Sequence, residues 1–336
     1  MKNIGFLVLT SALFVSAACF AEETSFSYRF ADAAEGAELR LSHTEYFDNM
    51  GRYDLEYRLQ KKDATLEELK TFAAGQMLDF TEEEKSILAD GMDDIAGICD
   101  ERGYVLPDEG DIVFVKSTMK DEQNAAAYTH GNEIYVGESL LSDGLSDDPE
   151  VQAEFKEVLA HELFHCLTRN NPDFRRDIYG ILGFTVEDED YEFPQQIKDI
   201  IINNPDVEHH DSHAVFSIGG EAKDCVVIFS TKKPFEKEGD SFFHYAMTGL
   251  VPVDGLDTVY SSDDADNFWD VFGKNTDYVI DPEETMADNF SYTIMYGPDG
   301  KEYETPGIIE QLDSYLKKGV TAKELVTEQL QKGNES

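Results

Sequence analysis

His161-Glu162-Leu163-Phe164-His165 is the stretch of this sequence that indicates both a fold and a chemistry. On an α-helix, positions i and i+4 lie on one face, so the two imidazoles can bind one metal ion. Glu162 directly follows the first of them, and its carboxylate can reach a water on that metal and accept a proton. The pattern therefore predicts a metal site at His161 and His165, with Glu162 as general base.

The flanking residues predict the helix that this argument requires. Asp148 is a good N-cap, and Pro149 suits the first helical position. Asn170-Asn171-Pro172 would end the helix. Between them, apolar residues recur at steps of three and four: Val151, Phe155, Val158, Leu159, Leu163, Cys166 and Leu167. We expect an amphipathic helix that runs to about Arg169, with both histidines beside its apolar stripe.

A catalytic zinc site usually has a third protein ligand, with water in the fourth position. Asp281 and Pro282 predict a second helix start. On that helix Glu284 and Asp288 share one face, so Glu284 could bind the metal and Asp288 could accept the N–H of a ligand imidazole. Glu283 points about 100° away and is expected to contribute little. An acidic first turn favoured by the helix dipole is the alternative for both glutamates.

His161-Glu162-Leu163-Phe164-His165 followed by Glu284-x-x-x-Asp288 resembles the gluzincin branch of zinc metallopeptidases, the thermolysin-like group. The resemblance implies zinc ligands at His161, His165 and Glu284, and one zinc ion per chain. It implies that Glu162 is the base and that Asp288 supports a histidine. It covers two short pieces of the chain. In thermolysin itself the glutamate follows soon after the second histidine, whereas here residues 166–283 intervene. A metzincin would need a glycine and a third histidine soon after His165, and residues 166–171 supply neither.

The same resemblance implies an α+β, zincin-like fold with an antiparallel edge strand before the active-site helix. Residues 126–129 and 133–136 predict a hairpin that suits this place. Upstream, Thr65 to Arg102 predicts two helices with a capping box at Thr81, and residues 112–115 predict a strand. An extended peptide could add to the edge of the hairpin, although an ordinary surface hairpin is the alternative.

The domain organisation follows from these elements. Residues 22–63 form an N-terminal segment whose alternation, as in Tyr53-Asp54-Leu55-Glu56-Tyr57-Arg58-Leu59, predicts strands or irregular structure. Residues 64–336 form the catalytic domain. A long insertion at about 170–280 would separate the two zinc-binding helices, and it mixes strands and loops after a possible helix at 173–184. Helices are expected again from Pro282, including 308–317 and 321–332.

The N-terminus predicts a cleaved secretion signal over residues 1–21. Lys2 gives a short positive region, residues 4–15 an apolar core, and Cys19-Phe20-Ala21 a small-residue end before Glu22. That run is too short to span a bilayer comfortably, so we expect a secreted or periplasmic protein without a transmembrane anchor. The alternative is a lipoprotein anchored at Cys19, because residues 16–19 resemble a lipobox.

Composition limits the partners. With 27 basic and 70 acidic residues, the formal charge is −43, which argues against nucleic-acid binding through the phosphate backbone. The charge could serve solubility or a saline environment, or it could steer cationic peptides or proteins to the cleft. Three cysteines follow the predicted signal, so one disulfide at most could form. Cys166 is expected in the core and not among the metal ligands.

We therefore expect a zinc-dependent metallopeptidase that hydrolyses peptide bonds. Two alternatives remain open: a catalytically silent binding protein that keeps the fold, and a zinc hydrolase of a non-peptide amide. The donor for the developing oxyanion is left unassigned by the motifs. Its candidates are Tyr179, His209, His210, His213 and His244.

Overall fold

A mixed sheet lies beneath the helix that carries the two histidines. The computed structural model describes residues 24–318 of the chain. The strand order of the sheet is β1-β3-β5-β4, with β2 pairing along β3. Strands β1, β3 and β5 are parallel, and β4 is antiparallel at the edge. The bounds are β1 Tyr28–Phe30, β2 Met77–Leu78, β3 Ile112–Ser117, β4 Ala127–His130 and β5 Glu133–Val136.

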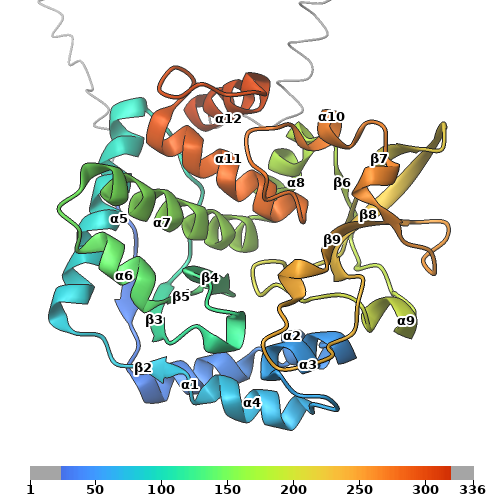
Figure 1. Ribbon diagram of the computed structural model, residues 1–336. Helices are drawn as coiled ribbons and strands as arrows, with labels where there is room; N and C mark the ends of the chain where they lie inside the picture. Colours follow the sequence, from blue (N-terminus) through green and yellow to red (C-terminus); the bar gives the residue numbers. More distant parts are fainter. Residues whose placement is uncertain (1–23, 319–336) are drawn as a thin grey trace, which may run out of the picture.

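Helices cover this sheet and form the main core with it. In Figure 1, α7 (Pro149–Asn170) and α11 (Pro282–Tyr296) lie side by side above the sheet, with α5 (Glu82–Arg102) beside them. Buried residues of these helices meet in one apolar cluster with β3 and β5: Leu88, Met92, Phe114, Ile134, Leu159, Leu163, Met286 and Phe290. The chain is thus an α+β protein, as expected from the sequence, and its edge strand β4 precedes α7.

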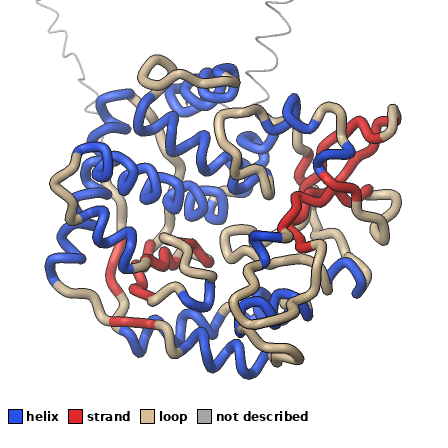
Figure 2. The backbone as a smooth tube through the Cα atoms, viewed as in Figure 1, coloured by secondary structure: helices blue, strands red, loops and turns tan. Residues whose placement is uncertain are grey.

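A second sheet of five strands is formed by residues between α7 and α11. It is an antiparallel meander in the order β10-β9-β8-β7-β6, on the right in Figures 1 and 2. Gly219 and Gly220 connect β7 to β8 with φ angles of 62° and 82°, a turn conformation that favours glycine. The bounds are β6 Thr185–Val186, β7 Ser212–Ile218, β8 Glu221–Thr231, β9 Ala246–Pro252 and β10 Tyr260–Ser261.

The N-terminal segment differs from the prediction of strands or irregular structure. After β1 it forms α1 (Ala33–Ser42), α2 (Thr44–Asp48) and α3 (Arg52–Leu59). The alternation over residues 53–59 was misleading, because seven residues fit both periods. The helix is favoured by the i,i+4 ion pair of Arg58 Nε with Asp54 Oδ1, at 2.6 Å.

Other predicted elements are confirmed. Thr65 and Thr81 form capping boxes at the starts of α4 (Leu66–Ala74) and α5. Two further helices, α8 (Pro172–Ile181) and α12 (Pro306–Lys318), also match, whereas the helix predicted at 321–332 lies outside the described residues. The remaining helices are short: α6 Glu138–Gly144, α9 Gln195–Lys198, α10 Phe268–Phe272, and 3₁₀ turns at Lys120–Glu122, Phe242–His244 and Ser262–Asp264.

The cysteines within residues 24–318 are all buried and unpaired: Cys99, Cys166 and Cys225. Cys166 lies in the core, as expected. Over the same residues, none of the helices combines the length and the apolar character needed to cross a membrane. The predicted signal and the alternative anchor at Cys19 lie outside the described part of the chain.

Candidate metal centre

Helix α7 positions three of the predicted residues. The Asp148 side chain caps its start by accepting the N–H of Glu150 at 2.9 Å, and Pro149 occupies the first turn. The apolar face of α7 packs into the main core. That packing buries Glu162 and His165, whereas the His161 side chain keeps 14% of its surface exposed. The two imidazoles therefore lie on one face, at the boundary between core and cleft.

Helix α11 supplies carboxylates from its first two turns. Asp281 caps the helix by accepting the N–H of Glu283 at 2.7 Å, so the predicted helix start is confirmed. Glu283 and Glu284 in the first turn are buried, and Asp288 follows one turn later. Because α11 packs along α7, this end of the helix faces the two histidines.

The structure brings His161, His165 and Glu284 together. Glu284 Oε2 lies 3.0 Å from His161 Nε2 and 3.8 Å from His165 Nε2. One ligand atom from each residue lies within 4.8 Å of the others. Tetrahedral zinc with bonds of about 2.0–2.2 Å places neighbouring ligand atoms roughly 3.4 Å apart. The two measured separations bracket that value.

His165 Nε2 gives a second test of whether these residues fit a metal ion. It is buried and has no hydrogen-bond partner within the described chain. A buried polar atom left without a partner costs about 1–3 kcal/mol. A metal ion bound to Nε2 would remove that cost. Two imidazole nitrogens and one carboxylate oxygen are also a donor set that zinc accepts in catalytic sites. The residues therefore fit a zinc ion.

The other ring nitrogen of each histidine meets a carboxylate. His161 Nδ1 lies 2.9 Å from Asp288 Oδ1, the contact expected from the sequence. Thr276 donates to the second Asp288 oxygen at 2.5 Å. Such a contact fixes the tautomer and the ring orientation of a metal-binding histidine. Asp288 is thus placed to hold His161 with Nε2 toward Glu284.

Glu283 plays the same part for His165, which the sequence reasoning missed. Its Oε1 lies 2.9 Å from His165 Nδ1 and accepts the Thr168 hydroxyl at 2.6 Å, and its other oxygen accepts the Tyr179 hydroxyl. Glu283 points away from the donor atoms, as expected from the sequence, but it lies at the far side of the His165 ring. Its small effect on metal binding, also expected from the sequence, stays a prediction, and this contact argues against it. Helices α7 and α11 run antiparallel here, so His165 meets the start of α11 and His161 its second turn.

Negative charge accumulates at this site. Burial alone would lower the pKa of His161, but the hydrogen bonds with Asp288 and Glu284 outweigh it and raise the pKa well above its ordinary value. Burial, together with the charges of Glu162 and Glu284, raises the pKa of Asp206 well above its usual range. The site therefore favours a cation, whether a proton on His161 or a metal ion.

Glu162 is held in place from the edge strand. The Thr129 hydroxyl donates to Glu162 Oε2 at 2.7 Å. Burial raises the pKa of Glu162, while the nearby charges of His161 and His165 act in the opposite direction. A carboxylate held in this way, beside two histidines that could bind a metal ion, has a position suited to a general base.

A cleft of about 380 Å³ opens beside Glu162 and His161. Its walls come from the chain before β4, from α7 and from α11, with Tyr278 above. None of the five oxyanion-donor candidates from the sequence lines this cleft within the described chain, and Tyr179 is bound to Glu283 instead. The lining residues are Ala125, Ala126, Ala127, Glu154, Glu157, Val158, His161, Glu162, Tyr278, Asp288, Ser291 and Tyr292.

Tyr278 brings to this cleft a hydroxyl that the sequence reasoning did not single out. The residue is 40% exposed, and it lines the same cleft as Glu162. Burial of part of the side chain and the charges of Glu284 and Asp206 raise the pKa of Tyr278 well above its ordinary value. The hydroxyl therefore keeps its proton and can donate it in a hydrogen bond. Residue 278 lies in a loop without a local motif, so no sequence signal marked it.

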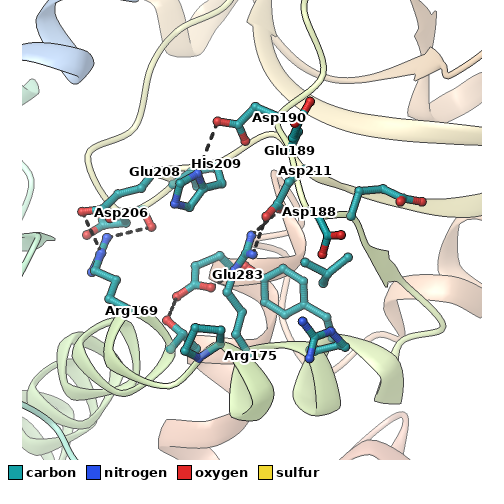
Figure 3. Close-up of a pocket in the computed structure, with 17 residues that line it drawn as sticks. Arg169, Arg175, Asp188, Glu189, Asp190, Asp206, Glu208, His209, Asp211 and Glu283 are labelled. Carbon is teal, nitrogen blue, oxygen red and sulfur yellow. Dashed lines mark hydrogen bonds and ion pairs between the residues drawn. The ribbon is translucent and has the colours of Figure 1, made fainter.

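A second cavity, of about 560 Å³, is lined by Glu283 and Asp206 among others (Figure 3). Arg175 crosses it and pairs with both oxygens of Asp211, at 2.7 and 2.6 Å. His209 Nδ1 lies 3.3 Å from Asp190 Oδ2 at its rim. Asp190, His209 and Asp211 could together hold a metal ion, but Arg175 already neutralises Asp211. The His209–His213 stretch is thus separate from the His161 group.

We compared the chain with protein-family models, with curated proteins and with solved structures. None of the three comparisons finds a match. The chemistry of this centre must therefore be argued from its own residues.

Proposed function

We propose that this protein is a zinc-dependent metallopeptidase of the gluzincin type, with His161, His165 and Glu284 as zinc ligands. The observation that carries the proposal is the buried Nε2 of His165, which has no hydrogen-bond partner among residues 24–318 and lies 3.8 Å from Glu284 Oε2 within a group of three donors. Support comes from Glu162 beside these donors and from the antiparallel edge strand β4 before α7, as a zincin-like fold requires.

Zinc bound at this site would polarise a substrate carbonyl and lower the pKa of a water toward neutrality. Glu162 would accept the proton from that water and pass it to the leaving amine. Thr129 keeps the Glu162 carboxylate oriented through the bond to Oε2. Asp288 and Glu283 hold the two imidazoles with Nε2 toward the site. Tyr278 would donate its hydroxyl to the developing oxyanion.

The edge strand suits an extended peptide. Thr129 directs its N–H and C=O away from β5, since both bond to groups outside the sheet. In an antiparallel pair the residue two positions away faces the same direction, so the backbone of Ala127 also faces outward. Ala127 lines the cleft beside Glu162. A peptide could pair there by β-augmentation and present its carbonyl to the site.

The cleft also indicates a substrate class. Glu154, Glu157 and Asp288 lie along its walls, and the whole chain carries a formal charge of −43. Such a field attracts cationic peptides and raises their rate of encounter. We propose basic peptides or proteins as the preferred substrates.

A digest of a peptide library by the zinc-loaded protein tests the proposal. We expect cleavage that a chelator abolishes and added zinc restores. Glu162→Gln is the matched variant, because its amide oxygen can still accept the Thr129 hydroxyl but cannot take a proton. It should bind zinc and fold normally, yet cleave nothing. Full activity in Glu162→Gln would place the base elsewhere. A zinc-loaded wild type that cleaves no peptide would favour the silent binding protein or the hydrolase of a non-peptide amide.

A further inference from the structure

Residues 203–208, which read Asn-Asn-Pro-Asp-Val-Glu, place two side chains beside the candidate metal centre. Asp206 is buried, and its Oδ1 lies 3.9 Å from His165 Nε2. The Asn204 side chain donates to Glu284 Oε1. Two side chains of this one segment therefore contact two of the three candidate zinc ligands. Asp206 also forms a second possible metal group with Glu162 and His165, with ligand atoms within 4.8 Å.

The same segment covers the edge that a peptide would use. Asp206 Oδ1 accepts the N–H of Thr129 at 2.5 Å, and Glu208 Oε1 accepts the N–H of Gly131 at 2.7 Å. An added strand would place a carbonyl at the Thr129 N–H, so the Asp206 carboxylate takes the position of a substrate carbonyl oxygen. Gly131 lies in the turn between β4 and β5, so Glu208 fixes the segment to that turn. Only the part of the edge near Ala127 remains on the open cleft.

Hydrogen bonds from buried and half-buried side chains hold the segment at its start and in its middle. Arg169 Nη2 donates to the carbonyls of Pro205 and Asp206 at 3.2 and 3.0 Å, and to the Thr129 carbonyl at 3.2 Å. The buried Asp54 accepts the Asn203 N–H at 2.9 Å, and the buried Arg58 donates to the Asn203 carbonyl at 2.5 Å. Arg169 therefore bonds both to residues 203–208 and to strand β4, which this segment covers. Several hydrogen bonds to buried or half-buried side chains therefore hold the segment in this position.

We infer that residues 203–208 are an autoinhibitory plug, in which Asp206 supplies a carboxylate to the zinc position that water must occupy for catalysis. This inference rests on the proposed function. A catalytic zinc site keeps one position open, whereas four protein ligands make a closed, structural site. With Asp206 bound to the metal the centre would be closed, and without Asp206 a position for water would be open. The open form requires the plug to leave Thr129 and His165, which frees the metal position and the strand edge together.

Cobalt-substituted protein tests the plug without relying on activity, because the visible absorption of Co²⁺ reports its ligands. Asp206→Asn keeps an acceptor for the Thr129 N–H but loses the anionic metal ligand. We expect its cobalt bands to shift from those of the wild type. Glu189→Gln is the matched control. It also removes one negative charge from a loop before α11, but Glu189 is exposed and lies outside residues 203–208, so its spectrum should match the wild type.

Binding of acetohydroxamate, a small metal-binding probe, gives a second readout. If the open form makes up about 1–10% of the wild type, opening the site should tighten binding roughly 10- to 100-fold. Asp206→Asn should show this gain, and Glu189→Gln should not. Identical spectra and equal affinities in all three cobalt-loaded proteins would overturn the plug and leave the proposed metal site intact. Failure of all three to bind cobalt would instead overturn the proposed function.

Discussion

His165 Nδ1 lies 2.9 Å from Glu283 Oε1, which directs the opposite ring nitrogen, Nε2, to the three-donor group. Glu283 is fixed in turn by Thr168 and Tyr179. A carboxylate in this position sets the tautomer of a metal-binding histidine and increases its basicity. The fold itself thus orients this candidate ligand.

Glu283→Ala should weaken zinc binding by about 10- to 100-fold, the usual cost of losing a partner of a ligand histidine. Competition with a chromophoric chelator measures the affinity. Glu150→Ala is the matched control, because Glu150 is also an acidic residue in the first turn of a helix, α7, but is exposed. Equal affinities of Glu283→Ala and Glu150→Ala would show that the contact with His165 is dispensable.

Glu284→Ala should lower zinc affinity more than Asp288→Ala does. The first change removes a ligand atom, whereas the second removes only the group that orients His161, at a cost of about 10- to 100-fold. The same chelator titration ranks the two variants. Equal, small losses in both would mean that the third ligand lies outside α11.

Zinc binding should release a proton and strengthen as the pH rises. The hydrogen bonds with Asp288 and Glu284 raise the pKa of His161 well above its ordinary value, so we expect metal-free His161 to carry a proton that zinc must displace. Zinc requires the neutral ring, and each proton released makes affinity rise by about tenfold per pH unit below that pKa. Calorimetry in buffers of different ionisation enthalpy counts the protons. A binding enthalpy independent of the buffer would contradict the exchange of a proton for the metal.

Tyr278→Phe should reduce the turnover number by about 10²- to 10³-fold, the typical loss of one oxyanion donor, while zinc affinity stays unchanged. Tyr292→Phe offers a control, since Tyr292 lines the same cleft. Steady-state kinetics on a cleaved peptide compares the two. An equally active Tyr278→Phe enzyme would remove Tyr278 from the mechanism.

Much of the centre could be predicted because its signals are local. The caps Asp148 and Asp281 and the spacing of the histidines each lie within a few residues, and the structure brings His161, His165 and Glu284 together on that basis. The same local reasoning failed at residues 53–59, where a short run fits both a strand and a helix and the pairing of Asp54 with Arg58 favours the helix.

Other parts of the site depend on tertiary contacts that no motif encodes. The contact of Glu283 with His165 follows from the antiparallel packing of α11 on α7. The angle of about 100° between Glu283 and Glu284 on one helix says nothing about which residues of a neighbouring helix each will meet. Asp206 reaches the site from a loop held by Arg169, and Tyr278 reaches it from another loop. Neither Asp206 nor Tyr278 belongs to a recognisable sequence motif, and only the folded chain places them beside the histidines.

The metal content of the purified protein tests the central claim most directly. Elemental analysis should find about one zinc ion per chain in the wild type, and almost none in His165→Ala after the same dialysis. Circular dichroism of both proteins would show that the fold is retained. A folded wild-type protein that remains free of zinc after equilibration with micromolar zinc, or a His165→Ala variant that retains the full amount, would contradict the account.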